Sequence, residues 1–194
     1  MMIDIYLALV HYPVYNKNME TVATSVTNFD IHDIARSCKT YAVKKYYIVH
    51  PLDTQKEIID KILYYWQEGY GEVYNSDRSE ALKTVQVLKD IAAVRDDIVQ
   101  ATGKQPLVVA TDACLYDNTV SYSEVPIIAK EENRPLLLLF GTGWGMEKGV
   151  MTSCDYILPP ILGRGSYNHL SVRSAVAIIL DRLVGEKWWQ NIEK

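Results

Sequence analysis

Two glycine-rich loops in the last third of the chain hold the residue types that let a backbone come close to a small ligand. The first loop, residues 141–145, has the sequence GTGWG and directly follows the apolar run 136–140. The second, residues 159–169, opens with two prolines, contains two glycines and follows the apolar run 156–158. Glycine has no Cβ and proline fixes the turn, so both loops can present main-chain groups at short range. This pattern predicts the binding of a ligand through main-chain contacts.

The spacing of the first loop does not match the two common nucleotide-binding fingerprints. A dinucleotide loop requires G-x-G-x-x-G, and the third position after Gly143 is Met146. A P-loop requires Gly-Lys before Ser or Thr, whereas Lys148-Gly149 has the opposite order. A nicotinamide-dependent dehydrogenase is therefore disfavoured. For this loop alone a structural turn and a ligand loop are equally consistent with the spacing, and the second loop favours the ligand loop.

The apolar runs before the loops are the elements that must position them. Unbroken apolar runs are typical of strands covered on both faces, as in the parallel sheets of α/β proteins. Strands are expected at residues 3–10, 46–50, 107–110, 136–140 and 156–158. Ligands bind such sheets in a crevice at the carboxyl ends of the strands. The two loops, with residues 111–113 after the third expected strand, are therefore predicted to meet at one edge.

Helices are expected between these strands. Thr27, Asn28 or Asp30 caps a helix that reaches residue 41, and Thr54 to Glu57 matches a capping box for the next helix. Further helices are expected at residues 79–102, 123–130 and 168–184. The alternation of strands and helices predicts an α/β fold with a mostly parallel sheet flanked by helices.

Composition is that of an ordinary globular protein. The chain has 194 residues, 48% hydrophobic and 23% charged, and residues 1–194 are expected to form a single domain. The net charge of −4 means that an RNA partner would be attracted by local basic patches or by another protein. The start lacks the pattern of a signal peptide, and no apolar run approaches the ~20 residues of a membrane span. Three widely spaced cysteines suit reduced thiols, so a cytoplasmic protein without a metal is expected.

The two loops lie within longer stretches that resemble a known family. Residues 136–146, LLLLFGTGWGM, and 155–180, DYILPPILGRGSYNHLSVRSAVAIIL, are similar to motifs two and three of the SPOUT superfamily of RNA methyltransferases. The resemblance is greatest to a subgroup found free-standing, or fused as an extra C-terminal domain to some tRNA (guanine-N1) methyltransferases. Residues 30–36 resemble motif one more weakly. The resemblance implies a C-terminal trefoil knot that holds S-adenosylmethionine, a homodimer with a shared active site, and an RNA substrate such as tRNA or rRNA.

Methyl transfer from a sulfonium is a direct displacement, so it requires positioning and the exclusion of water rather than a metal. The resemblance assigns the cofactor-binding residues to three segments. They are Thr111, Asp112 and Ala113; Phe140, Gly141, Thr142, Gly143, Trp144 and Gly145; and Ile157, Leu158, Pro159, Ile161, Gly163, Ser166, Asn168, His169 and Leu170.

Two residues are the candidates for catalysis. Arg36 resembles the family arginine that clamps an RNA phosphate or the acceptor base, and the alternative is an exposed helix arginine. Asn168 either orients the acceptor or the cofactor, or only caps the last helix. His169 is either a base or a structural histidine at a helix start. Asp112 either neutralises the amino group or sulfonium of the cofactor or is an ordinary loop aspartate.

The chain departs from the family pattern at several positions. Thr142 to Trp144 occupy the place of a common glutamate, and the nearest glutamate is Glu147. Tyr167 and His169 interrupt motif three, and Asp30 replaces the usual asparagine of motif one. The first hypothesis is an S-adenosylmethionine-dependent RNA methyltransferase. The second is a non-catalytic S-adenosylmethionine-binding accessory module of an RNA-modifying system.

Overall fold

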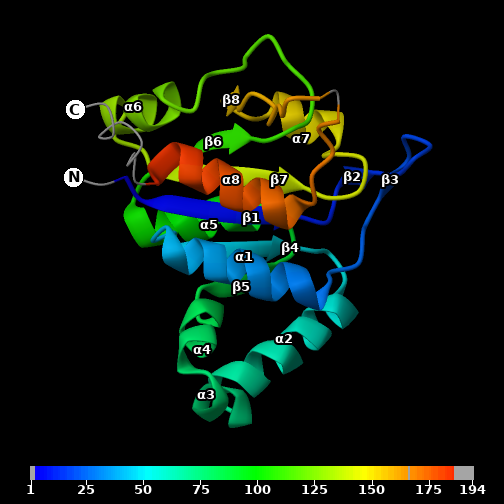
Figure 1. Cartoon of the computed structure of the whole chain (residues 1–194), viewed down its shortest axis with the longest axis vertical. Coiled ribbons are helices and arrows are strands. Elements are labelled where there is room, and N and C mark those ends of the chain that lie inside the picture. The colour runs from blue at the N-terminus through cyan, green and yellow to red at the C-terminus, as the bar shows by residue number, and fades with distance from the viewer. Residues whose placement is uncertain (1–2, 166, 186–194) are drawn as a thin grey trace.

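The computed structural model describes residues 3–165 and 167–185 and has an α/β architecture (Figure 1). A six-stranded sheet has the order β5-β4-β1-β7-β6-β8, and every neighbouring pair within it is parallel. Its strands are β1 (Ile5–Val10), β4 (Lys45–Val49), β5 (Val85–Leu88), β6 (Leu107–Ala110), β7 (Leu136–Gly141) and β8 (Tyr156–Ile157). The predicted parallel sheet flanked by helices is confirmed.

Helices cover both faces of the sheet. On one face α1 (Asn28–Thr40) and α8 (Val172–Val184) lie side by side, α1 against β4 and α8 against β7 (Figure 1). The cluster on this face also includes buried residues of α2 (Asp53–Gln67), α4 (Ser76–Leu82) and α6 (Glu124–Glu131). The opposite face is covered by α5 (Ile91–Thr102) and α7 (Lys148–Thr152). Each central strand alternates its side chains between these two clusters, which explains why β1 and β7 are apolar throughout.

Two further pieces complete the fold. After β1 the chain forms a small antiparallel pair, β2 (Val14–Tyr15) with β3 (Thr21–Val22), before it enters α1. The short helix α3 (Tyr70–Tyr74) joins α2 to α4, and these three helices project below the sheet in Figure 1. None of the helices within residues 3–165 and 167–185 is long and apolar enough to cross a membrane.

The expected helix over residues 79–102 is wrong. Its apolar stripe fits helical spacing, but the chain leaves α4 after Leu82 and forms β5, whose residues alternate between buried and half-buried. Val85 and Val87 pack into the core while β5 pairs with β4, so tertiary packing overrides the local helical pattern. Asp90 then caps α5 by accepting a hydrogen bond from the Ala93 amide.

Two expected helix starts are also wrong. Helix α2 has Leu52 as its N-cap and no side-chain cap, so the Thr54 capping box does not form. A capping box forms instead at α1, where Thr27 and Asp30 satisfy each other's backbone amides. Helix α8 begins at Val172, with the Ser171 side chain accepting from the Ser174 amide, rather than at Asn168.

Candidate functional site

A cavity of about 890 Å³ opens at the carboxyl ends of β1, β6 and β7. This volume is within the range of ligand pockets in proteins. Most of the residues predicted to bind a cofactor line this cavity. They are Thr111, Asp112, Ala113, Phe140, Gly141, Thr142, Gly143, Trp144, Gly145, Pro159, Ile161, Asn168, His169 and Leu170. The two glycine-rich loops therefore share one cavity, together with the segment that follows β6.

Three predicted cofactor residues, among those that the structure describes, are not in the cavity wall. Ile157 and Leu158 are buried in the two core clusters, and their amides donate to Asn118 and Ala110 carbonyls within the protein. These residues belong to the sheet, so neither their side chains nor their amides are free for a ligand. Gly163 is not among the lining residues, and Ser166 lies outside the described part of the chain.

The first glycine loop is held against the β2 strand. The Trp144 amide donates to the Tyr15 carbonyl at 2.9 Å, and the Tyr15 amide donates to the Gly145 carbonyl at 2.9 Å. Gly143 has φ +61°, and a Cβ there would lie 2.7 Å from the Tyr15 carbonyl oxygen. A side chain at this position would therefore separate the loop from β2. Gly143 is therefore required for the close packing of the loop against β2, as well as for the approach of a ligand to the main chain of the loop.

The segment after β6 brings a carboxylate to the cavity. Asp112 accepts hydrogen bonds from the Cys114 amide at 3.1 Å and the Tyr116 hydroxyl at 2.7 Å. Burial, and then this bond to Asp112, raise the pKa of Tyr116, so the hydroxyl stays protonated as a donor. A Cβ added at Gly145 would lie 3.9 Å from Asp112 Oδ2, so the carboxylate adjoins the glycine loop.

The two predicted catalytic residues have different positions. Asn168 lines the cavity, and its side-chain amide donates to the Ala113 carbonyl at 3.0 Å, which joins the second loop to the segment after β6. Asn168 does not cap α8. Arg36 is exposed on α1 and is not among the residues that line the cavity of its own chain.

A second wall of the cavity comes from residues that sequence reasoning missed. They are His11, Thr24, Ser25, Thr27 and Asp30, from the segment between β1 and the first turn of α1. The sequence signal for this wall is the expected strand at residues 3–10, because the residues after every strand of a parallel sheet lie at the same edge. That this strand neighbours β7 follows from the strand order of the structure. His11 has no metal-ligand spacing to other residues, so the sequence assigns it no role. Within the described residues no group of three or more His, Cys, Asp or Glu could hold a metal ion.

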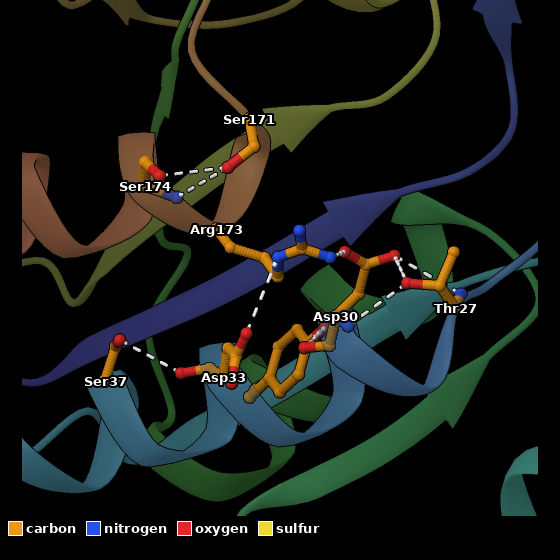
Figure 2. A network of polar contacts seen from close by, with 8 residues as sticks. Thr27, Asp30, Asp33, Ser37, Ser171, Arg173 and Ser174 are labelled. Carbon is orange, nitrogen blue, oxygen red and sulfur yellow. Dashed lines mark hydrogen bonds and ion pairs between the residues drawn. The ribbon is translucent and has the colours of Figure 1, made fainter.

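Asp30 links this wall to the C-terminal helix. Figure 2 shows Arg173 of α8 extending between Asp30 and Asp33 of α1. Arg173 Nη1 lies 3.5 Å from Asp30 Oδ1, and Arg173 Nε lies 3.5 Å from Asp33 Oδ2. The Thr27 hydroxyl donates to the other oxygen of Asp30 at 2.6 Å. Asp30 is thus a buried carboxylate with a partner on each of its two oxygens. Burial of a charged group is costly unless the group has such partners.

The fold and the cavity define an α/β protein that binds a small ligand at the carboxyl edge of a parallel sheet. Residues 4–185 match the model of a family described as SAM-dependent RNA methyltransferase, and the chain belongs to this family. It is therefore an enzyme that uses S-adenosylmethionine.

Curated relatives agree with this membership. An uncharacterized protein of Aquifex aeolicus is 44% identical over 93% of this chain and 88% of its own length. The tRNA (guanine-N(1)-)-methyltransferases of Nitratidesulfovibrio vulgaris and Oleidesulfovibrio alaskensis are 45% and 44% identical over 94% of this chain. The chain spans only 42% of the length of each of these two enzymes.

Solved structures show the same fold at low sequence identity. A probable methylase family protein from Haemophilus influenzae matches 100% of this chain and 72% of its own, with 19% identity and a TM-score of 0.61. The SpoU methyltransferase AviRb from Streptomyces viridochromogenes, in complex with AdoMet, matches 100% and 60%, with 17% identity and a TM-score of 0.57. The predicted resemblance to RNA methyltransferases is confirmed by the family match and the curated relatives, and these structures share the fold.

The cavity has features that suit S-adenosylmethionine, which combines a flat adenine, a ribose and two cationic groups. Phe140, Pro159 and Ile161 supply apolar surface for a base. Asp112 supplies a negative charge beside the glycine loop, where a sulfonium or ammonium group is stabilised by a carboxylate. The residues present in the cavity therefore fit the cofactor.

Proposed function

We propose that this protein methylates a nucleotide of tRNA or rRNA as a homodimer, with its cofactor held in a knotted pocket. The observation that carries the proposal is the single cavity that both glycine loops, Asp112 and Asn168 share. The names of the two bacterial tRNA methyltransferases support a tRNA substrate. The similarity covers only part of each of these enzymes, so it does not identify the base that this chain methylates.

S-adenosylmethionine supplies an electrophilic methyl group, and the chain supplies the geometry of the displacement. The main chain of residues 141–145 and Asp112 would hold the two ends of the cofactor, while Pro159 and Ile161 would exclude water from the base. Asn168 would fix the second loop through its bond to the Ala113 carbonyl. Positioning of this kind raises the rate without a covalent enzyme intermediate.

The C-terminal part of the chain supports the proposed knot. The segment after β8 is tied to the one after β6 at two points, where Tyr122 donates to the Pro159 carbonyl and Asn168 to the Ala113 carbonyl. The chain then returns to pack α8 beside α1, on the far side of β7. These two contacts, together with the return of α8 to the layer beside α1, are the support for the proposed knot.

Arg36 supports the proposed dimer. Its side chain is exposed and outside the cavity of its own chain, so a catalytic role requires the cavity of a second copy. In the proposed dimer Arg36 would bind an RNA phosphate or the acceptor base next to the partner's cofactor. A shared active site would thus make the dimer the functional unit.

Incubation of the protein with tritiated S-adenosylmethionine and purified tRNA or rRNA tests the proposal. We expect label in RNA from the wild-type chain, and a loss of at least tenfold in Arg36→Ala with unchanged S-adenosylhomocysteine binding. Lys56→Ala, which removes an exposed lysine of α2, is the matched control and should keep full activity. A protein that binds the cofactor product but labels neither RNA contradicts the proposal.

The second candidate is a cofactor-binding accessory module of an RNA-modifying system. The match to only 42% of the two tRNA methyltransferases favours it, because the rest of those chains could carry the RNA site. The same assay separates the two candidates. The accessory module predicts S-adenosylhomocysteine binding, no label in RNA and copurification with another RNA enzyme.

A further inference from the structure

The first glycine-rich loop carries a tryptophan that is largely open to solvent. Trp144 is among the residues that line the cavity, and it is 65% exposed. Aromatic side chains of this size bury the most surface of any residue and dominate the energetics of cores and binding sites. The loop therefore holds at the cavity an aromatic side chain that is mostly left uncovered by the fold.

Trp66 shows how a tryptophan is used within this fold. Its ring lies edge to face with the rings of His32 and Tyr65, each at a centroid distance of 5.4 Å, and the Arg78 guanidinium lies 4.7 Å from its centroid. Among the described residues no ring or cation lies against Trp144 in this way. The Trp144 ring is thus available to an aromatic partner from outside the chain.

The backbone around Trp144 is fixed. The Trp144 amide donates to the Tyr15 carbonyl at 2.9 Å, and the Gly145 carbonyl accepts from the Tyr15 amide at 2.9 Å. The Gly145 amide donates to the Thr142 carbonyl at 3.1 Å, which closes the turn. The two flanking glycines, Gly143 and Gly145, have φ of +61° and +99°. Because this turn is already ordered, a ligand that contacts the side chain loses little affinity to ordering of the loop.

The proposed cofactor contacts do not use the Trp144 side chain. The main chain of residues 141–145 and Asp112 would hold the two ends of the cofactor, and Pro159 and Ile161 would cover its base. A reacting cofactor is shielded from water. Trp144 is instead mostly exposed to the solvent from which the RNA arrives.

A nucleotide that enters the cavity loses the stacking of its own RNA strand. Enzymes that do chemistry on a base take the base out of the stack and surround it with aromatic or apolar side chains. Stacking on an aromatic ring suits every base, because every base has a π-face. Such a contact also needs no positive charge, which suits a chain with a net charge of −4.

We propose that Trp144 stacks on the base of the RNA nucleotide that enters the cavity to be methylated. This inference rests on the proposed function and names the side chain that receives the acceptor. The ring of Trp144 holds the base while the main chain of the same loop holds the cofactor. One ordered loop thereby sets the two reactants side by side.

Two substitutions separate stacking from apolar bulk. Trp144→Leu removes the ring and keeps an apolar side chain, whereas Trp144→Phe keeps an aromatic face. We expect Trp144→Leu to lower kcat/KM for RNA by about 10- to 100-fold, chiefly through KM, and Trp144→Phe to stay within about threefold of wild type. Thermal denaturation, the Kd of S-adenosylhomocysteine and the mass of the dimer should not change. Tyr64→Leu, which removes a 67% exposed ring of α2 outside the cavity, is the control and should keep wild-type kinetics.

Fluorine-19 NMR of the protein labelled with 5-fluorotryptophan tests the contact without any turnover. Trp144→Phe and Trp66→Phe identify the two signals. With S-adenosylhomocysteine bound, unfractionated tRNA and, in a second titration, rRNA are added. One of these RNAs should shift the Trp144 signal and leave the Trp66 signal unchanged. A protein that shows this shift but transfers no methyl group contradicts the proposed function and still supports the contact.

Four results would overturn the inference. The first is a Trp144 signal that neither RNA moves, and the second is wild-type kinetics in Trp144→Leu. The third is a parallel loss of S-adenosylhomocysteine affinity, which would make the ring part of the cofactor site. The fourth is a loss of the dimer in analytical ultracentrifugation, which would make the ring a contact between two copies.

Discussion

Arg173 Nη1 of α8 lies 3.5 Å from Asp30 Oδ1 of α1, so an ion pair joins the C-terminal helix to the wall of the cavity. The Asp30 side chain is 10% exposed, and Arg173 is its only cationic partner among the described residues. The pair fixes the first turn of α1 against α8 at the edge where the site forms (Figure 2). This contact between distant parts of the sequence predicts that Arg173 stabilises both the fold and the site.

Replacement of Arg173 by methionine should destabilise the protein by about 1–2 kcal/mol, because it leaves the Asp30 carboxylate buried with Thr27 as its remaining side-chain partner. Urea denaturation at pH 7.5 measures the change. Asp33→Asn removes the more exposed partner of Arg173 and should cost less than about 0.5 kcal/mol. Equal stability of wild-type and Arg173→Met would show that the buried pair contributes nothing.

Replacement of Gly143 by alanine should cost about 1–3 kcal/mol and weaken cofactor binding, since the new Cβ would lie 2.7 Å from the Tyr15 carbonyl oxygen. Gly103→Ala is the matched control. Gly103 also has positive φ, +71°, but a Cβ there meets nothing within 4 Å, so only the backbone strain remains. Thermal denaturation and calorimetry with S-adenosylhomocysteine should show lower stability in both variants and weaker binding in Gly143→Ala alone.

Stability should fall as the pH drops from about 6.5 to 4. The folded-state pKa of His11 is lowered to about 4, so between these values the unfolded chain binds a proton that the folded chain does not. The derivative of unfolding free energy with pH is therefore positive in this window, and full protonation would remove about 3 kcal/mol. Denaturation of wild-type and His11→Asn at pH 7.5 and 5.0 checks this. The variant should lose less stability on acidification, and parallel losses would contradict the assignment.

Neutralisation of Asp112 should weaken the binding of the cationic cofactor. Asp112→Asn keeps the size of the side chain and removes the charge beside the glycine loop, for which we expect about a tenfold higher Kd for S-adenosylmethionine. Tyr116→Phe removes the 2.7 Å hydrogen bond to Asp112 but leaves the charge, and it should have a smaller effect. Calorimetric titration compares the three proteins. An unchanged Kd in Asp112→Asn would place the cationic groups elsewhere.

Much of the fold follows from local pattern in the sequence. The unbroken apolar runs at β1, β6 and β7 predict buried parallel strands, because only a strand covered on both faces needs no polar side. The edge strand β5 could not be predicted, because its local apolar pattern is that of a helix. Its Val85 and Leu88 continue a helical stripe from Leu82, and only pairing with β4 makes it a strand.

The candidate site was half predictable. The glycine loops and residues 111–113 carry their signal in residue type and position after a strand, and they do line one cavity. The wall from β1 depends on the strand order, which places β1 beside β7, and no local pattern contains that order. Ile157 and Leu158 show the converse, since a position next to a loop says nothing about the face on which a side chain lies.

A crystal structure of the protein with S-adenosylhomocysteine would test the account most directly. We predict density for the ligand between residues 141–145 and Pro159, with the amino-acid end beside Asp112. Ligand density outside this cavity, or an amino-acid end away from Asp112, would contradict the proposed site.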